Sequence, residues 1–184
     1  AMFFSKKFTL AGPIRGLVLV GYMMPMSVTA LLGKNLFLLD GGVINDLLMK
    51  VHLISSPIDW LVNGGTALGA VIAVNCWVGI PFNMLLLTSG LTGISTDIYE
   101  SASMDGANAF KRFIYITLPL MKPAMLSVLM LGFIYTFKAF DLMYIMTAGG
   151  PFKSTDVLGT YAYSKAFTQY EFSQGSAIAM VLFA

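Results

Sequence analysis

Residues 97–123 read DIYESASMDGANAFKRFIYITLPLMKP, and this stretch is the longest polar interruption between two strongly apolar segments of the chain. Asp97, with Glu100 three residues later, predicts the start of a short helix, because a capping side chain satisfies the free N–H groups of a first turn. Gly106 predicts the end of that helix, since glycine accepts the left-handed backbone that closes a helix. A second amphipathic run follows, in which four side chains are expected to share one face: Phe110, Phe113, Ile114 and Thr117. The stretch is therefore expected to fold into two short helices, which is more structure than a simple connector needs.

Composition bounds the class of protein. Hydrophobic residues make up 57% of the 184 residues and charged residues only 11%, against about 25% charged in average soluble domains. This balance predicts a membrane protein. The net charge of +2 comes from scattered basic residues, so no nucleic-acid partner is expected. The single cysteine, Cys76, lies in an apolar run and is interpreted as a packing residue; no metal site and no cofactor are expected.

The apolar segments predict the number of spans. Three segments are long enough to cross a bilayer core of about 30 Å at about 1.5 Å per residue, and a fourth is not. The spans are expected at about 14–32, 66–91 and 118–145, with the start of another at 175–184. The polar loop at 93–117 would join the second span to the third. The sequence thus predicts an all-α polytopic membrane protein, in which residues 1–184 are a fragment of one transmembrane domain that continues at both ends.

The polar loop carries a resemblance to a known family. Glu100-Ser101-Ala102, then Gly106, then Ile116-Thr117-Leu118-Pro119 resembles the EAA loop of ATP-binding-cassette (ABC) importer permeases, whose pattern is EAA, three residues, G, nine residues and I-x-L-P. Ser101 stands where alanine is usual, a small departure that should still pack. VNCWVGIPFNMLLLTSGL (74–91) and FDLMYIMTAGGP (140–151) are also similar to the sugar-importer branch, of which the maltose transporter's larger permease subunit is one member. The resemblance covers nearly the whole chain.

The resemblance implies a MetI-like permease domain and a function. The protein would be the transmembrane subunit of an importer for a sugar or oligosaccharide, embedded as a multi-pass protein in the bacterial inner (cell) membrane. Its implied partners are a dimer of cytoplasmic ATP-binding subunits, a second permease subunit, an extracytoplasmic solute-binding protein and membrane lipid. The loop at 93–117 would be the contact with the ATPase. The residues implied in this coupling are Glu100, Ser101, Ala102, Asp105, Gly106 and Ala107.

Polar and small residues inside the spans are candidates for substrate binding, because a polar group in a bilayer needs a partner. Asn75, Gly79 and Phe82 share one helix face, and this spacing alone is equally typical of helix–helix packing. In the family that the chain resembles, this face lines the substrate site. Gly132 and Thr136 repeat the spacing, and Tyr22 precedes Pro25, whose missing N–H frees a carbonyl. The candidate substrate-binding residues are Tyr22, Asn75, Gly79, Phe82, Gly132 and Thr136.

Charge bias gives an orientation. The central loop holds Lys111, Arg112 and Lys122, and Lys6, Lys7 and Arg15 precede the first span, whereas the other two loops hold four lysines offset by acidic residues. Since cytoplasmic loops carry the excess of basic residues, the central loop is expected to be cytoplasmic.

Two other functions compete with the importer. An ion-coupled secondary transporter would need ionisable residues deep in the spans, and the complete spans have none at mid-depth. A structural or anchoring membrane subunit would need no polar helix faces that converge on a cavity. The chain has no phosphate-binding GxxxxGK[ST] loop and no catalytic set, so it is not expected to be an enzyme. ATP would be hydrolysed on a separate subunit.

Overall fold

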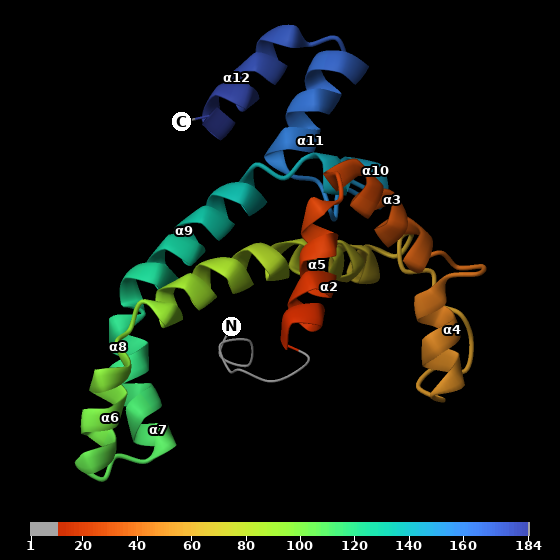
Figure 1. Ribbon diagram of the computed structural model, residues 1–184. Coiled ribbons are helices and arrows are strands. Elements are labelled where there is room, and N and C mark those ends of the chain that lie inside the picture. The colour runs from red at the N-terminus through yellow and green to blue at the C-terminus, as the bar shows by residue number, and fades with distance from the viewer. Residues whose placement is uncertain (1–10, 184) are drawn as a thin grey trace. The chain divides into compact units, whose positions relative to one another are not determined.

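The computed structural model describes residues 11–183, and every regular element in this range is a helix (Figure 1). The all-α prediction is therefore confirmed. Lys6 and Lys7, which entered the orientation argument, lie outside the described residues. The chain divides into two compact units, one of residues 11–23 with 79–134 and one of residues 24–78 with 135–183.

The segment expected to be the first span is two helices. Helix α2 (Ala11–Met23) ends just before Pro25, and α3 (Met26–Leu36) begins just after it. Proline has no N–H and disfavours helical backbone at the residue before it, which explains the break at this position. The helical segment also runs four residues beyond the predicted end at 32.

Helix α5 (Gly64–Thr92) contains the whole of the predicted span 66–91 in 29 unbroken residues. Within residues 11–183 it is the one helix that is long and apolar enough to cross a membrane alone. The number rises to three if two helix pairs, each separated by a short break, are counted as one span each. Between α3 and α5 lies the amphipathic helix α4 (Val43–Lys50).

The segment expected to be the third span, 118–145, is divided among α8 (Leu118–Leu120), α9 (Lys122–Phe137) and α10 (Asp141–Thr147). The helical path bends by 62° where α8 meets α9. Pro123 lies in the first turn of α9, where its missing N–H costs least, as the sequence predicts. The C-terminal part comprises α11 (Leu158–Tyr163), the π-helix η2 (Ser164–Thr168) and α12 (Phe172–Phe183).

Helix α3 packs against α10 and α5 in the core of the second unit. Gly33 makes this approach possible, because a Cβ there would lie 2.7 Å from a methyl carbon of Val74. Leu142 and Val71 are fully buried at this contact. The core residues of this unit are Ala30, Phe37, Ala70, Val71, Val74, Leu142, Met143 and Met146.

The loop expected to form two short helices does so, in the first unit. It consists of α6 (Thr96–Met104), α7 (Ala109–Arg112) and the π-helix η1 (Phe113–Thr117), which lie beside one another in Figure 1.

Candidate functional site: the α6–α7 hairpin and the polar positions of the spans

The first helix of the hairpin starts two residues earlier than the predicted cap. Ser95 is the capping residue, and its hydroxyl oxygen accepts a hydrogen bond from the Asp97 N–H at 3.3 Å. The prediction that Asp97 caps the helix is therefore wrong. Asp97 instead lies in the first turn, where a carboxylate is favoured by the helix dipole.

The hairpin turns at Gly106, whose φ of +75° lies in the left-handed region that the sequence predicts. The Ala107 N–H donates to the Ala102 carbonyl at 2.9 Å, and the Gly106 N–H donates to the Ser103 carbonyl at 3.1 Å. This pair of bonds is the Schellman arrangement that closes a helix. Asn108 then starts the second helix by accepting a hydrogen bond from the Lys111 N–H at 2.9 Å.

Two side-chain hydrogen bonds join the two arms of the hairpin. The hydroxyls of Tyr99 and Thr117 share a hydrogen bond of 2.9 Å. Further toward the turn, the Arg112 guanidinium donates to the Ser103 hydroxyl at 2.5 Å. Because Thr117 is only 5% exposed, the Tyr99–Thr117 hydrogen bond lies inside the hairpin. The angle between the arms is therefore fixed at both the turn and the base.

The second arm does not present the predicted apolar face. Phe110 is 70% exposed, whereas Thr117 is buried, so they do not share a face as expected. The cause is the π-helical segment η1, because its wider turns rotate the residues after Phe113 relative to an α-helix. Met104 and Tyr115 are also exposed, at 87% and 76%. The hairpin thus displays large apolar side chains that its own fold does not cover.

The residues that the EAA pattern singles out lie on α6 and the turn after it. Glu100, Ser101, Asp105 and Gly106 are exposed, and Ala102 and Ala107 are partly buried. The two alanines are thus partly covered by the hairpin, and the acidic side chains remain in solvent. This arrangement can present a carboxylate next to an apolar surface on a rigid support.

Within the first unit, the candidate substrate residues include one aromatic pair. The rings of Tyr22 on α2 and Phe82 on α5 stack with their centroids 6.2 Å apart and 18° between their planes. Tyr22 is half exposed and Phe82 partly buried. A Cβ on Gly79 would meet only the Asn83 amide nitrogen, at 3.5 Å, and one on Gly132 would meet nothing within 4 Å. These glycines therefore leave open surface on their helices rather than a tight helix contact.

Within the second unit, the other two candidates contact each other. The Asn75 side-chain amide donates to the Thr136 hydroxyl at 3.5 Å. At this length the bond is weak, and both groups retain capacity for another partner. The sequence prediction did not anticipate that these two residues would pair.

Asn83 is a polar residue that the sequence analysis missed. Its side-chain oxygen is buried and has no hydrogen-bond partner among the described residues. It lies one turn beyond Gly79 on the same side of α5, so the criterion that selected Asn75 would also have selected it. An unpaired amide oxygen in a span calls for a donor.

The described residues contain no group of three or more His, Cys, Asp or Glu side chains that could hold a metal ion. The features that can be compared with known proteins are the α6–α7 hairpin and the polar positions of the spans. The family model of the binding-protein-dependent transport system inner membrane component matches residues 1–184. The chain belongs to this family.

Two relatives align with this chain over its whole length. The trehalose/maltose transport system permease protein MalF of Thermococcus litoralis is 32% identical over 183 residues, which are 100% of this chain and 61% of that protein. The sulfoquinovosyl glycerol transport system permease protein SmoG of Agrobacterium fabrum is 33% identical over 184 residues, 100% of this chain and 59% of that protein. The chain thus spans about three fifths of the length of these relatives.

The fold is shared with a solved transporter. A crystal structure of a bacterial ABC transporter involved in the import of the acidic polysaccharide alginate superposes with a TM-score of 0.85 at 19% identity, over 97% of this chain and 63% of that one. At this identity the likeness establishes the permease fold alone. It does not transfer a substrate.

Proposed function

We propose that this chain is part of a transmembrane subunit of an ABC importer for a sugar or oligosaccharide, located as a multi-pass protein in the bacterial inner membrane. Its family membership and the sugar-transport names of its relatives support this assignment. Its partners are a dimer of cytoplasmic ATP-binding subunits, a second permease subunit and an extracytoplasmic solute-binding protein. The chain itself does not hydrolyse ATP.

The observation that carries the proposal is the rigid hairpin of α6 and α7. Its turn is fixed by Gly106 and its base by the Tyr99–Thr117 hydrogen bond, while Met104, Phe110 and Tyr115 remain exposed. Exposed apolar side chains on a preorganised support are typical of a protein-binding surface. A rigid element between two spans can also transmit a partner's movement as a rigid-body displacement.

The substrate contacts proposed here are the six span positions named from the sequence. Aromatic rings can stack on the apolar face of a sugar, and amide and hydroxyl groups can bond to its hydroxyls. The Tyr22–Phe82 pair supplies the first kind of group, and the Asn75–Thr136 pair supplies the second. Gly79 and Gly132 keep helix surface open for a ligand to approach. Asn83 is added as a seventh position, because its oxygen needs a donor.

The test is sugar uptake by proteoliposomes that contain the full-length permease with its partner permease and ATPase subunits, with the solute-binding protein added outside the vesicles. Uptake of a radiolabelled sugar is expected to require ATP inside the vesicles and to persist when an ionophore collapses the ion gradients. The permease subunits alone are expected to show no ATP hydrolysis. Uptake driven by an ion gradient without ATP would instead establish a secondary transporter and contradict the proposal.

A further inference from the structure

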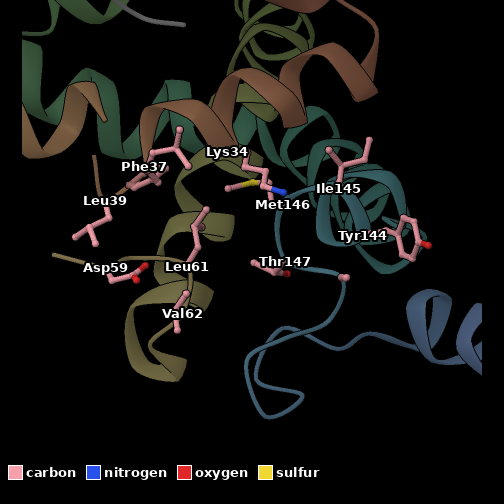
Figure 2. Close-up of a pocket in the computed structure, with 12 residues that line it drawn as sticks. Lys34, Phe37, Leu39, Asp59, Leu61, Val62, Tyr144, Ile145, Met146 and Thr147 are labelled. Atoms are coloured by element: carbon pink, nitrogen blue, oxygen red, sulfur yellow. The ribbon is translucent and has the colours of Figure 1, made fainter. Parts of the chain in front are cut away.

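A pocket of about 470 Å³ lies in the second unit, and none of the residues that line it belongs to the hairpin or to the span positions named above (Figure 2). Three segments line it: the end of α3 with the residues after it, the loop that precedes α5, and the end of α10. Its volume is within the range of about 300–1,000 Å³ that small-molecule sites occupy. The lining residues include two opposite charges, Lys34 and Asp59.

Asn45 fixes two of the three walls. It is 1% exposed, and its side-chain NH₂ group donates to the carbonyls of Leu38 at 3.1 Å, Leu39 at 3.3 Å and Ile58 at 3.0 Å. Its side-chain oxygen accepts from the Ile58 N–H at 3.1 Å and from the Trp60 indole N–H at 2.8 Å. One buried side chain therefore ties the segment after α3 to the loop before α5. The pocket is preformed rather than a gap between loose loops.

The polar groups of the pocket differ in what they already bind. The Thr147 hydroxyl donates to the Met143 carbonyl at 3.0 Å and shares a 2.6 Å hydrogen bond with Thr155. Lys34 and Asp59, in contrast, form no ion pair with each other or with any other residue in the part of the chain that the structure describes. Figure 2 shows them on different walls, Lys34 on the helix side and Asp59 on the loop side. The pocket thus offers a separated cation and anion to a ligand.

A ligand that satisfies both charges must itself carry both. A neutral sugar would leave each charge without a counter-charge, and a simple anion would be repelled by Asp59. The rim is apolar, because Leu38, Leu39 and Val62 line the pocket and are exposed. Further leucines of α3 next to Lys34 are exposed as well: Leu31, Leu32 and Leu36. Opposite charges bordered by uncovered apolar surface fit an amphiphile with a zwitterionic head.

We propose that this pocket binds the headgroup of a zwitterionic phospholipid of the phosphatidylethanolamine type. The phosphate lies at Lys34 and the ammonium lies at Asp59, and an acyl chain follows the exposed leucines of α3. A cation in the last turn of a helix is already favoured by the helix dipole, which places Lys34 at low cost. The inference rests on the proposed membrane location but not on the substrate or on coupling to an ATPase.

Native mass spectrometry of the assembled transporter, with the full-length permease, tests the proposal. The complex is incubated with equal amounts of phosphatidylethanolamine and phosphatidylglycerol that have identical acyl chains. Wild type is expected to retain phosphatidylethanolamine in preference to phosphatidylglycerol. Asp59→Asn should lower this ratio roughly two- to fivefold, the effect of one partly solvated charge contact, and Lys34→Gln should lower retention of both lipids.

Asp46→Asn and Lys50→Gln are the matched controls, because they make the same changes on exposed positions of α4 outside the pocket. They should keep the wild-type ratio. The proposal is overturned if the pocket variants and the controls retain the two lipids alike. It is also overturned if the pocket variants keep the wild-type lipid ratio but lose sugar uptake, because the pocket would then serve the substrate or a protein partner.

Discussion

Two asparagines of the second unit carry the same amide group but differ in how many hydrogen bonds it makes. Asn45 is buried and uses both its donor and its acceptor capacity on backbone and indole groups around it. Asn75 is partly exposed and makes one long hydrogen bond to Thr136. A fully used amide holds a structure together, whereas a mostly unused one is available to a ligand. The two residues therefore predict opposite consequences of substitution.

Asn45→Ala should destabilise the permease by about 2–4 kcal/mol, because it leaves several buried backbone groups unpaired. Asn45→Asp keeps the oxygen that accepts from Ile58 and Trp60 but loses the donor to three carbonyls, so it should be nearly as harmful. The measurement is the thermal unfolding temperature of the purified permease. Asp46→Asn, at the next position on the exposed side of α4, is the control and should lower that temperature far less, because it removes only a helix-dipole contact worth under about 1 kcal/mol.

Asn75→Ala should weaken sugar uptake per assembled complex by about two- to tenfold, the value of one polar contact, and leave assembly with the ATPase intact. Whole-cell uptake and co-purification of the ATPase are measured together. Ser127→Ala is the matched control, because the Ser127 hydroxyl bonds to the Pro123 carbonyl of its own helix. Loss of assembly with unchanged uptake per complex would show that Asn75 is a packing residue.

At the scale of elements, glycines decide how closely helices approach. A Cβ on Gly90 of α5 would lie 2.7 Å from the Cβ of Ala124 on α9 and 3.1 Å from the Met121 sulfur. Near the other end of the same helix, a Cβ on Gly69 would meet nothing within 4 Å. A glycine-to-alanine substitution is therefore expected to have different effects at Gly90 and at Gly69.

Gly90→Ala should destabilise the permease by about 1–3 kcal/mol through overpacking. Gly69→Ala should leave its stability unchanged or raise it by about 0.5–1 kcal/mol, because alanine has the higher helix propensity. Unfolding temperatures of the two variants, compared with wild type, check this difference. Equal effects of the two substitutions would show that α5 and α9 do not pack closely at Gly90.

Structural features that depend on neighbouring residues in the sequence could be predicted. Features that depend on other parts of the fold could not. Gly106 follows a polar helix end, so its positive φ could be predicted from residue type alone. Pro25 predicts an interruption of the first span, but a proline inside a span can kink or end a helix, and helical periodicity does not distinguish the two outcomes. The π-helix at Phe113–Thr117 has no sequence signal of its own, so α-helical spacing placed Phe110 and Thr117 on one face although only Thr117 is buried.

In the candidate site, too, positions along one helix could be predicted and contacts between helices could not. The face of Asn75, Gly79 and Phe82 follows from helical spacing, and α5 is one unbroken helix through all three. The partners of these residues, Thr136 and Tyr22, come from distant parts of the chain. Spacing along one helix cannot specify a contact with another. The coupling role of the loop and the substrate role of the span positions remain predictions.

At the scale of the whole molecule, the proposed importer requires that the α6–α7 hairpin transmit the state of an ATPase to the spans. The hairpin follows directly on the last turn of α5 and leads through α8 into α9. A change in the angle between its arms would therefore move the surface that carries Met104 and Phe110 without disturbing the spans. Gly106 sets that angle, since its left-handed backbone joins the arms.

The most direct test is substrate-stimulated ATP hydrolysis by the reconstituted transporter carrying Gly106→Val, together with a pull-down of the ATPase subunit. A β-branched residue costs about 1–2 kcal/mol or more in the left-handed region, whereas asparagine is tolerated there. Gly106→Val should insert into the membrane normally yet fail to hold or stimulate the ATPase, and Gly106→Asn should retain most of the stimulation. If Gly106→Val binds and stimulates the ATPase like wild type, the hairpin is not the element that couples the ATPase to the spans.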